Sequence, residues 1–172
     1  TFHAHPHWLA KALWGPYVID LIFNSGNGAV PVDALWFRHA SRVQLWGRSM
    51  GLCPAEELIW SKSYIMERER FDGADILHVL RACGERLVWD RVLWRFAAHP
   101  ELLLAHLLLF EFFYPSERAR IPEHVVPALW RALRRERAKF DGRKLCRGTL
   151  LSRAQYLPDI REWGYTDARI QP

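Results

Sequence analysis

The sequence lacks most of the features that mark secreted, membrane-spanning and metal-scaffold proteins. It has three cysteines, which are scattered and do not have the paired spacing of a zinc site. They therefore predict reduced thiols and a cytoplasmic protein. No stretch has the pattern of a secretory signal peptide. The most apolar run, residues 102–114, is interrupted by His106 and Glu111 and is too short to span a bilayer. We therefore expect a soluble chain with no membrane partner.

The composition that is present is that of a folded domain. Half of the 172 residues are hydrophobic and nine are tryptophan, enough to bury a core in one domain. The net charge of +5 and the isoelectric point near 9.4 suit an anionic ligand. The first residue is threonine, and we expect the chain to be a piece cut from a longer protein.

The first 53 residues predict two β-hairpins. Residues 13–23 form the first, with a turn at Gly15-Pro16 and a strand rich in β-branched and aromatic residues. Both faces of that strand are apolar, which predicts that it is covered on both sides. A short helix at 33–40 precedes the second hairpin at 43–53, whose turn lies near Gly47.

Asp20 is the exception in the first apolar strand. A carboxylate in such a strand needs a cation, a metal or a hydrogen-bond donor. A salt bridge to Lys11 or Arg38 is one explanation. We favour a functional carboxylate, since strands hold active-site groups rigidly.

The turn at residues 24–28 follows the Asp20 strand and contains Ser25 and Asn27. Its two glycines are able to adopt positive φ, so the backbone amides are able to approach a phosphate.

A long helix is expected from Pro54 to about residue 70. Lys62 lies in the middle of its apolar stripe, while Glu56 points into water on the opposite face. One explanation is that Lys62 reaches the rim or pairs with Glu69, two turns later. The other is that its ammonium faces a cleft that holds an anion such as phosphate.

The remaining residues predict a helical C-terminal half. Asp72 and Asp75 have the spacing of a capping box for a helix over 73–83. Further helices are expected at 89–96, 101–113, 122–139 and 152–163, with the 102–113 run as the hub of the core. Residues 131–147 are rich in lysine and arginine, which predicts a solvated basic helix and tail. Contact with RNA or DNA is the less favoured interpretation, because no nucleic-acid motif accompanies the charge.

Three stretches taken together resemble the bacterial nucleotidyltransferase-like proteins of the polymerase-beta-type nucleotidyltransferase superfamily. They are residues 6–11 running into the strand and turn at 18–28, then 53–62, then 66–75. The tail at 146–152 is also similar to that group. The order and spacing of these stretches carry the resemblance, which covers nearly the whole chain.

The resemblance implies a magnesium-dependent transfer of a nucleoside monophosphate from a nucleoside triphosphate to a hydroxyl acceptor. Three carboxylates hold the metal in that superfamily, and by position Asp20 matches the third. Lys62 matches a lysine near the nucleotide phosphates, while Ser25 and Asn27 lie in a turn expected beside them. Asp72 and Asp75 match an acidic helix-junction motif whose role is structural.

One part of the pattern is missing: no Asp-x-Asp strand with its preceding Gly-Ser turn occurs in the sequence. Residues 1–53 are therefore predicted to be the remnant of a small mixed sheet, with residues 54–172 packed on it in one α+β domain. One carboxylate cannot organise a magnesium shell, so we expect these residues alone to be inactive. The alternative is a non-catalytic remnant or binding module with an anion-binding cleft.

Overall fold

Antiparallel strands open the chain in the computed structural model, which describes residues 2–5, 8–139, 141–152 and 154–170. β1 (Phe2–His5), β2 (Leu9–Trp14) and β3 (Tyr17–Ile22) pair in the order β1-β2-β3, which makes β3 an edge strand. Gly15 turns the chain between β2 and β3 with a φ of 58°, which glycine adopts without steric cost. The predicted hairpin is confirmed, although its first strand begins earlier, at Leu9.

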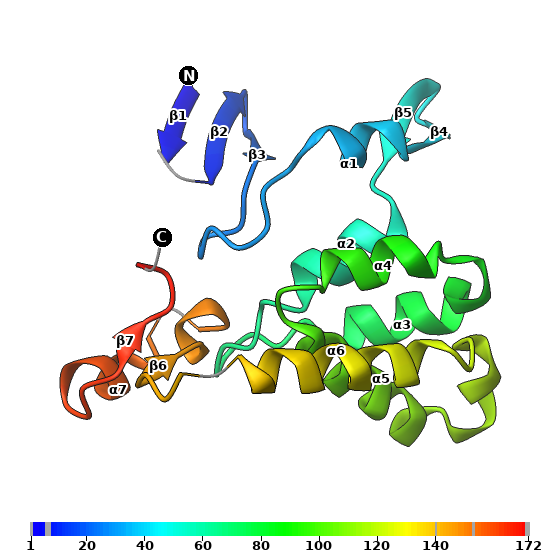
Figure 1. The fold of residues 1–172 in the computed structure, drawn as a ribbon. Coiled ribbons are helices and arrows are strands. Elements are labelled where there is room, and N and C mark those ends of the chain that lie inside the picture. The colour runs from blue at the N-terminus through cyan, green and yellow to red at the C-terminus, as the bar shows by residue number, and fades with distance from the viewer. Residues whose placement is uncertain (1, 6–7, 140, 153, 171–172) are drawn as a thin grey trace.

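The second hairpin is also confirmed and follows the short helix α1 (Ala34–Arg38). β4 (Ser41–Leu45) and β5 (Arg48–Leu52) are joined through Trp46 and Gly47, whose φ values are 49° and 73°. Two positive φ angles give the turn the twist that flanking strands require. The two hairpins belong to separate antiparallel sheets instead of one mixed sheet. Both lie outside the helical part of the molecule (Figure 1).

Helices make up most of the chain after residue 54. They are α2 (Ala55–Lys62), α3 (Gly73–Cys83), α4 (Trp89–Arg95), α5 (Pro100–Phe113) and α6 (Val125–Ala138), with short 3-10 turns at Gly84–Arg86, Pro115–Arg120 and Gly148–Leu150. The C-terminal part adds β6 (Leu145–Cys146), which pairs in parallel with β7 (Thr166–Asp167), and α7 (Leu157–Arg161). The chain is thus α+β, with small hairpin sheets followed by a mostly helical C-terminal half.

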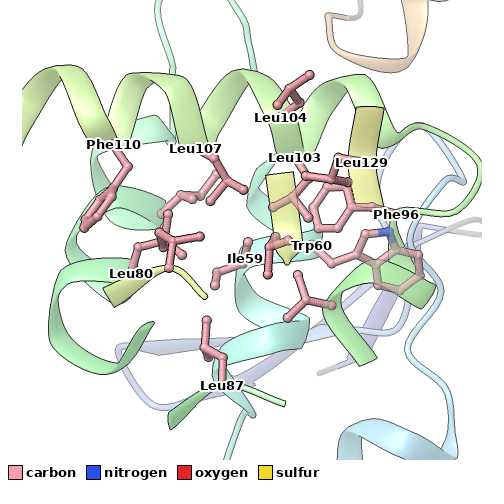
Figure 2. Close-up of a cluster of buried hydrophobic side chains, with 14 of the residues drawn as sticks. Ile59, Trp60, Leu80, Leu87, Phe96, Leu103, Leu104, Leu107, Phe110 and Leu129 are labelled. Atoms are coloured by element: carbon pink, nitrogen blue, oxygen red, sulfur yellow. The ribbon is translucent and has the colours of Figure 1, made fainter. Parts of the chain in front are cut away.

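The core lies between the helices, and α5 is its hub, as its apolar sequence predicts. Leu103, Leu107 and Phe110 of α5 are at most 1% exposed. Around them pack buried side chains from the other helices, among them Ile59, Trp60, Leu80, Phe96 and Leu129 (Figure 2). Burial of large apolar side chains from every helix of the bundle is the main force that holds this part together.

The N-terminal sheet contributes little to this core. Leu9 and Ala10 of β2 are buried, whereas every residue of β3 is exposed. The connection after β3 carries Val30 into the core cluster, and the Asn27 side-chain amide donates to the Leu150 carbonyl. The sheet is therefore attached to the helical part mainly through its following turn.

The last predicted helix is shorter than expected. The Ser152 hydroxyl accepts the Gln155 amide at 3.2 Å, as a capping box requires, but α7 begins only at Leu157. Pro158 explains the late start, because a proline inside a helix lacks the N–H that the preceding turn needs.

Candidate functional site

Lys62 lies at the end of α2 and is held by two carboxylates. Its ammonium is 2.9 Å from Asp72 Oδ2 and 2.6 Å from Asp75 Oδ2. Arg70 adds bonds from Nε and Nη2 to the Asp72 carboxylate at 3.0 and 3.1 Å. We call these four residues the Lys62 cluster. The Lys62 side chain is 22% exposed, so it is only partly buried.

The predicted pairing of Lys62 with Glu69 is wrong, because α2 ends at Lys62 instead of continuing to residue 70. Glu67 and Arg70 exchange backbone hydrogen bonds in a tight turn, and the Met66 amide donates to Leu151. These hydrogen bonds take the place of the backbone bonds that would continue α2, and the turn brings Asp72 back beside Lys62. Glu69 instead pairs with Arg68 at the surface.

The electrostatics of the Lys62 cluster keep its groups charged. Burial lowers the pKa of Lys62, but hydrogen bonds to Asp75 and Asp72 outweigh it and hold that pKa above the ordinary value. Burial likewise raises the pKa of Asp72, and the bonds from Arg70 and Lys62 lower it further than burial raises it. Asp72 begins α3 without a side-chain capping bond, so its carboxylate serves the cluster and not the predicted capping box.

Asp20 lies in a solvent-exposed ion pair on the N-terminal sheet. Its Oδ1 is 2.7 Å from Lys11 Nζ, directly across the β2–β3 register. The Asp20 side chain is 47% exposed. The prediction that this strand is covered on both sides is wrong, because among the described residues none packs closely on either face. The salt bridge to Lys11 is the explanation that sequence reasoning weighed against a functional carboxylate.

Ser25 and Asn27 organise the turn that follows β3. The Ser25 hydroxyl donates to Asn27 Oδ1 and accepts the Val30 amide at 2.9 Å. Asn27 Oδ1 also accepts the Ala29 amide at 3.0 Å, while its Nδ2 bonds the Leu150 carbonyl. These contacts occupy the polar atoms of both side chains within the protein.

The structure thus places the predicted site residues in three separate settings. Asp20 pairs with Lys11, Lys62 with Asp72 and Asp75, and Ser25 with Asn27. Within the described residues, no group of three or more His, Cys, Asp or Glu side chains is arranged to hold a metal ion. Asp20 offers a single carboxylate, and the residues described here do not by themselves fit a magnesium shell.

Sequence reasoning missed a buried ionic network between α2 and α4. Glu57 is fully buried, and its Oε2 is 2.7 Å from Arg95 Nε. Arg95 also bonds both oxygens of Asp33 at 2.6 and 2.9 Å and stacks over the Trp60 ring. Arg91 pairs with Glu56, which is buried and does not point into water as predicted. The i, i+4 spacing of the two arginines was the available signal.

Two hollows lie on the helical part, away from the predicted site residues. One of about 300 Å³ is lined mainly by apolar residues of α4, α5 and α6, and Arg135, Glu136 and Lys139 also line it. The other, of about 530 Å³, lies beside Glu111 and Arg118. Neither is lined by Asp20 or Lys62.

Comparisons with protein-family models, with curated proteins and with solved structures found no match to this chain. Among the described residues, none of the helices combines the length and apolar character that a membrane span requires.

Proposed function

We propose that the chain is part of a nucleotidyltransferase that moves a nucleoside monophosphate from a nucleoside triphosphate to a hydroxyl acceptor with Mg²⁺. The observation that carries the proposal is β3, an apolar strand with Asp20 near its centre. It forms an edge of its sheet and is exposed along its whole length. Such a strand fits a larger sheet in which further strands lie beside the one that bears the third metal-binding carboxylate.

Two residues of this chain have roles in the proposed function: Asp20 as a ligand of the metal and Lys62 as a contact to the nucleotide phosphates. The Asp20 carboxylate is exposed and has Lys11 as its partner, so a divalent cation is able to reach it from solvent. Lys62 keeps its positive charge between Asp72 and Asp75, and Asp75 is itself 54% exposed. A phosphate therefore meets a fixed ammonium whose attraction for anions is reduced by two neighbouring carboxylates. Ser25 and Asn27 shape the turn beside the Asp20 strand.

Transfer itself requires residues beyond these. In-line displacement at phosphorus depends on metal ions held by several carboxylates, and the resemblance assigns two of them to an Asp-x-Asp strand. We therefore propose that the residues of this chain bind nucleotide and do not transfer it alone. The three free cysteines suit the reducing cytoplasm, where we place the protein.

A non-catalytic binding module is the second candidate, and one observation favours it. Asp20 and Lys62 have separate partners, and no ion pair or hydrogen bond joins them. An anion-binding module needs only a cation such as Lys62, so its nucleotide binding does not depend on a metal.

Calorimetric titration with ATP, in the presence and absence of Mg²⁺, separates the two candidates. The nucleotidyltransferase proposal predicts binding that requires Mg²⁺ and weakens at least about tenfold in Asp20→Asn, as is typical when a metal site is damaged. Glu123→Gln, at an exposed carboxylate on the helical part, is the matched control and leaves binding unchanged. Binding that is equal with and without Mg²⁺, and equal in Asp20→Asn, would overturn the proposal in favour of the module.

A further inference from the structure

α6 carries arginines that have no partner among the described residues. Arg131, Arg134, Arg135 and Arg137 are all exposed, and none forms an ion pair or a hydrogen bond with any of the described residues. Three of the cations that follow along the chain are different, since each pairs with a nearby carboxylate: Lys139 with Glu136, Arg143 with Asp141 and Arg147 with Glu101. Lys144 instead contacts the Trp163 carbonyl and the Tyr165 ring. Within residues 131–147, arginines without a carboxylate partner are therefore concentrated on the helix.

The helix geometry directs three of these arginines to one side. At 100° per residue, Arg131, Arg134 and Arg135 span an arc of about 100°. Leu129 and Leu133, which are buried in the core, lie on the opposite side. The rise of 1.5 Å per residue spaces the three Cα atoms over about 6 Å along the axis. Three guanidinium groups thus project together from a rigid, well-anchored element.

The chemistry of this face suits a chain of phosphates. A guanidinium binds a phosphate through two parallel hydrogen bonds and stays charged at every physiological pH. Trp130 lies beside Arg134 on the helix and is 43% exposed, which leaves part of its ring available for stacking on a base. A membrane surface fits less well, because the apolar side of α6 is buried and cannot enter lipid.

We propose that this face of α6 binds the phosphate backbone of a single-stranded nucleic acid, with a base stacked on Trp130. The sequence alone favoured a solvated basic helix. The structure adds that Arg131, Arg134 and Arg135 have no partner in the part of the chain that it describes, share one side of the helix and lie next to an exposed aromatic ring. The proposal is independent of the nucleotidyltransferase function.

The chain offers a matched control for the charge on α6. Arg38, Arg42 and Arg48, on α1 and the β4–β5 hairpin, are likewise exposed and without partners among the described residues. Arg42 pairs with Gly51 and Arg48 with Leu45 in the register. Cross-strand partners share a face and successive residues alternate, so Arg42 and Arg48 point to opposite faces of the hairpin. They do not form one surface.

The test is fluorescence anisotropy with a labelled 20-nucleotide single-stranded RNA and the DNA of the same sequence, from 50 to 300 mM salt. Arg131→Gln/Arg134→Gln/Arg135→Gln is expected to weaken binding at least tenfold at low salt. The slope of log K against log salt is also expected to become about 2 units less negative, which is the value for three lost phosphate contacts on a single strand. The control Arg38→Gln/Arg42→Gln/Arg48→Gln changes net charge equally and is expected to weaken binding less than threefold.

Trp130→Ala separates stacking from charge. It is expected to weaken binding about tenfold while leaving the salt slope unchanged, because a lost stack releases no counterion. Thermal unfolding by circular dichroism verifies that each variant is folded. Equal weakening by the two triple variants would overturn the proposal, since it would show diffuse attraction to net charge. The absence of wild-type binding at 50 mM salt would overturn it as well. So would tighter binding to a duplex, made by annealing the labelled strand to its complement and titrated under the same conditions, than to the single strand.

Discussion

His106 is fully buried on α5, and neither of its ring nitrogens has a hydrogen-bond partner among the described residues. Its ring stacks on that of Phe71 with 6.1 Å between centroids. Burial lowers the pKa of His106 to about 4, well below its ordinary value of 6.5. The fold therefore accommodates only the neutral imidazole, and protonation works against folding.

His106 contributes to the pH dependence of stability. Between pH 6.5 and 4 the unfolded chain binds a proton at this residue and the folded chain does not, so the free energy of unfolding falls as pH falls through that window. The pKa difference corresponds to a loss of about 3 kcal/mol by pH 4. His106→Leu removes this contribution and also removes an unsatisfied polar group, which we expect to raise stability at pH 7 by about 1 kcal/mol.

Urea unfolding of wild type and His106→Leu at pH 7, 5.5 and 4.5 measures the effect. The difference between the two proteins is expected to grow as the pH falls, because the variant lacks the group that titrates. His78→Gln is the control, at an exposed histidine on α3, and its unfolding free energy follows the wild type. Parallel pH profiles for wild type and His106→Leu would contradict the prediction.

At the scale of elements, Arg95 links three segments that are distant in sequence. It joins α4 to Glu57 of α2 and to Asp33 at the start of α1, and its side chain is only 4% exposed. An ion pair in such a place contributes less than its geometry suggests, because both charges lose hydration. Loss of only one partner is costly, since the other charge remains buried.

Arg95→Met is therefore expected to lower the free energy of unfolding by about 3–5 kcal/mol. The double variant Glu57→Leu/Arg95→Met, which removes both buried charges, is expected to regain at least half of that loss. Urea unfolding at pH 7 measures all three proteins. If the double variant is less stable than Arg95→Met, the cost does not come from the stranded Glu57 carboxylate.

At the scale of the whole molecule, the N-terminal sheet is an exposed apolar surface. Val18 and Ile22 of β3 are more than half exposed on either side of Asp20. Edge strands of this kind pair readily with other chains unless charged side chains prevent it. Self-association at high concentration is the expected behaviour of these 172 residues.

Val18→Lys/Ile22→Lys is expected to keep the protein monomeric at concentrations where the wild type associates, as measured by light scattering. The free energy of unfolding is expected to change by no more than about 0.5 kcal/mol, because both side chains are on the surface. Leu108→Lys/Phe112→Lys makes the same exchange at exposed positions of α5. An equal effect of the two double variants would show that β3 has no particular role in association.

Local sequence patterns predicted most of the fold, whereas contacts between residues distant in sequence determine the surroundings of the candidate site residues. The turns at Gly15 and Gly47, the Pro54 helix start and the α5 hub are encoded within a few residues and were predicted correctly. The neighbours of Lys62 were not, because the end of α2 depends on a bond between Met66 and Leu151, far along the chain. The prediction that the Asp20 strand is buried was wrong for a related reason. An apolar sequence pattern indicates that a strand is able to pack against apolar neighbours, but it does not indicate whether the fold places such a neighbour there.

The bond from Asn27 to Leu150 joins positions 123 residues apart. A ribosome that adds 5–20 residues per second synthesises Leu150, the acceptor, roughly 6 to 25 seconds after Asn27, the donor. During that interval the helices between them are able to assemble, since their contacts are shorter in range. The turn that follows β3, at the blue end of the ribbon in Figure 1, therefore lacks this bond until residue 150 has been added, and nascent chains leave the Asn27 side chain accessible to chaperones during that interval.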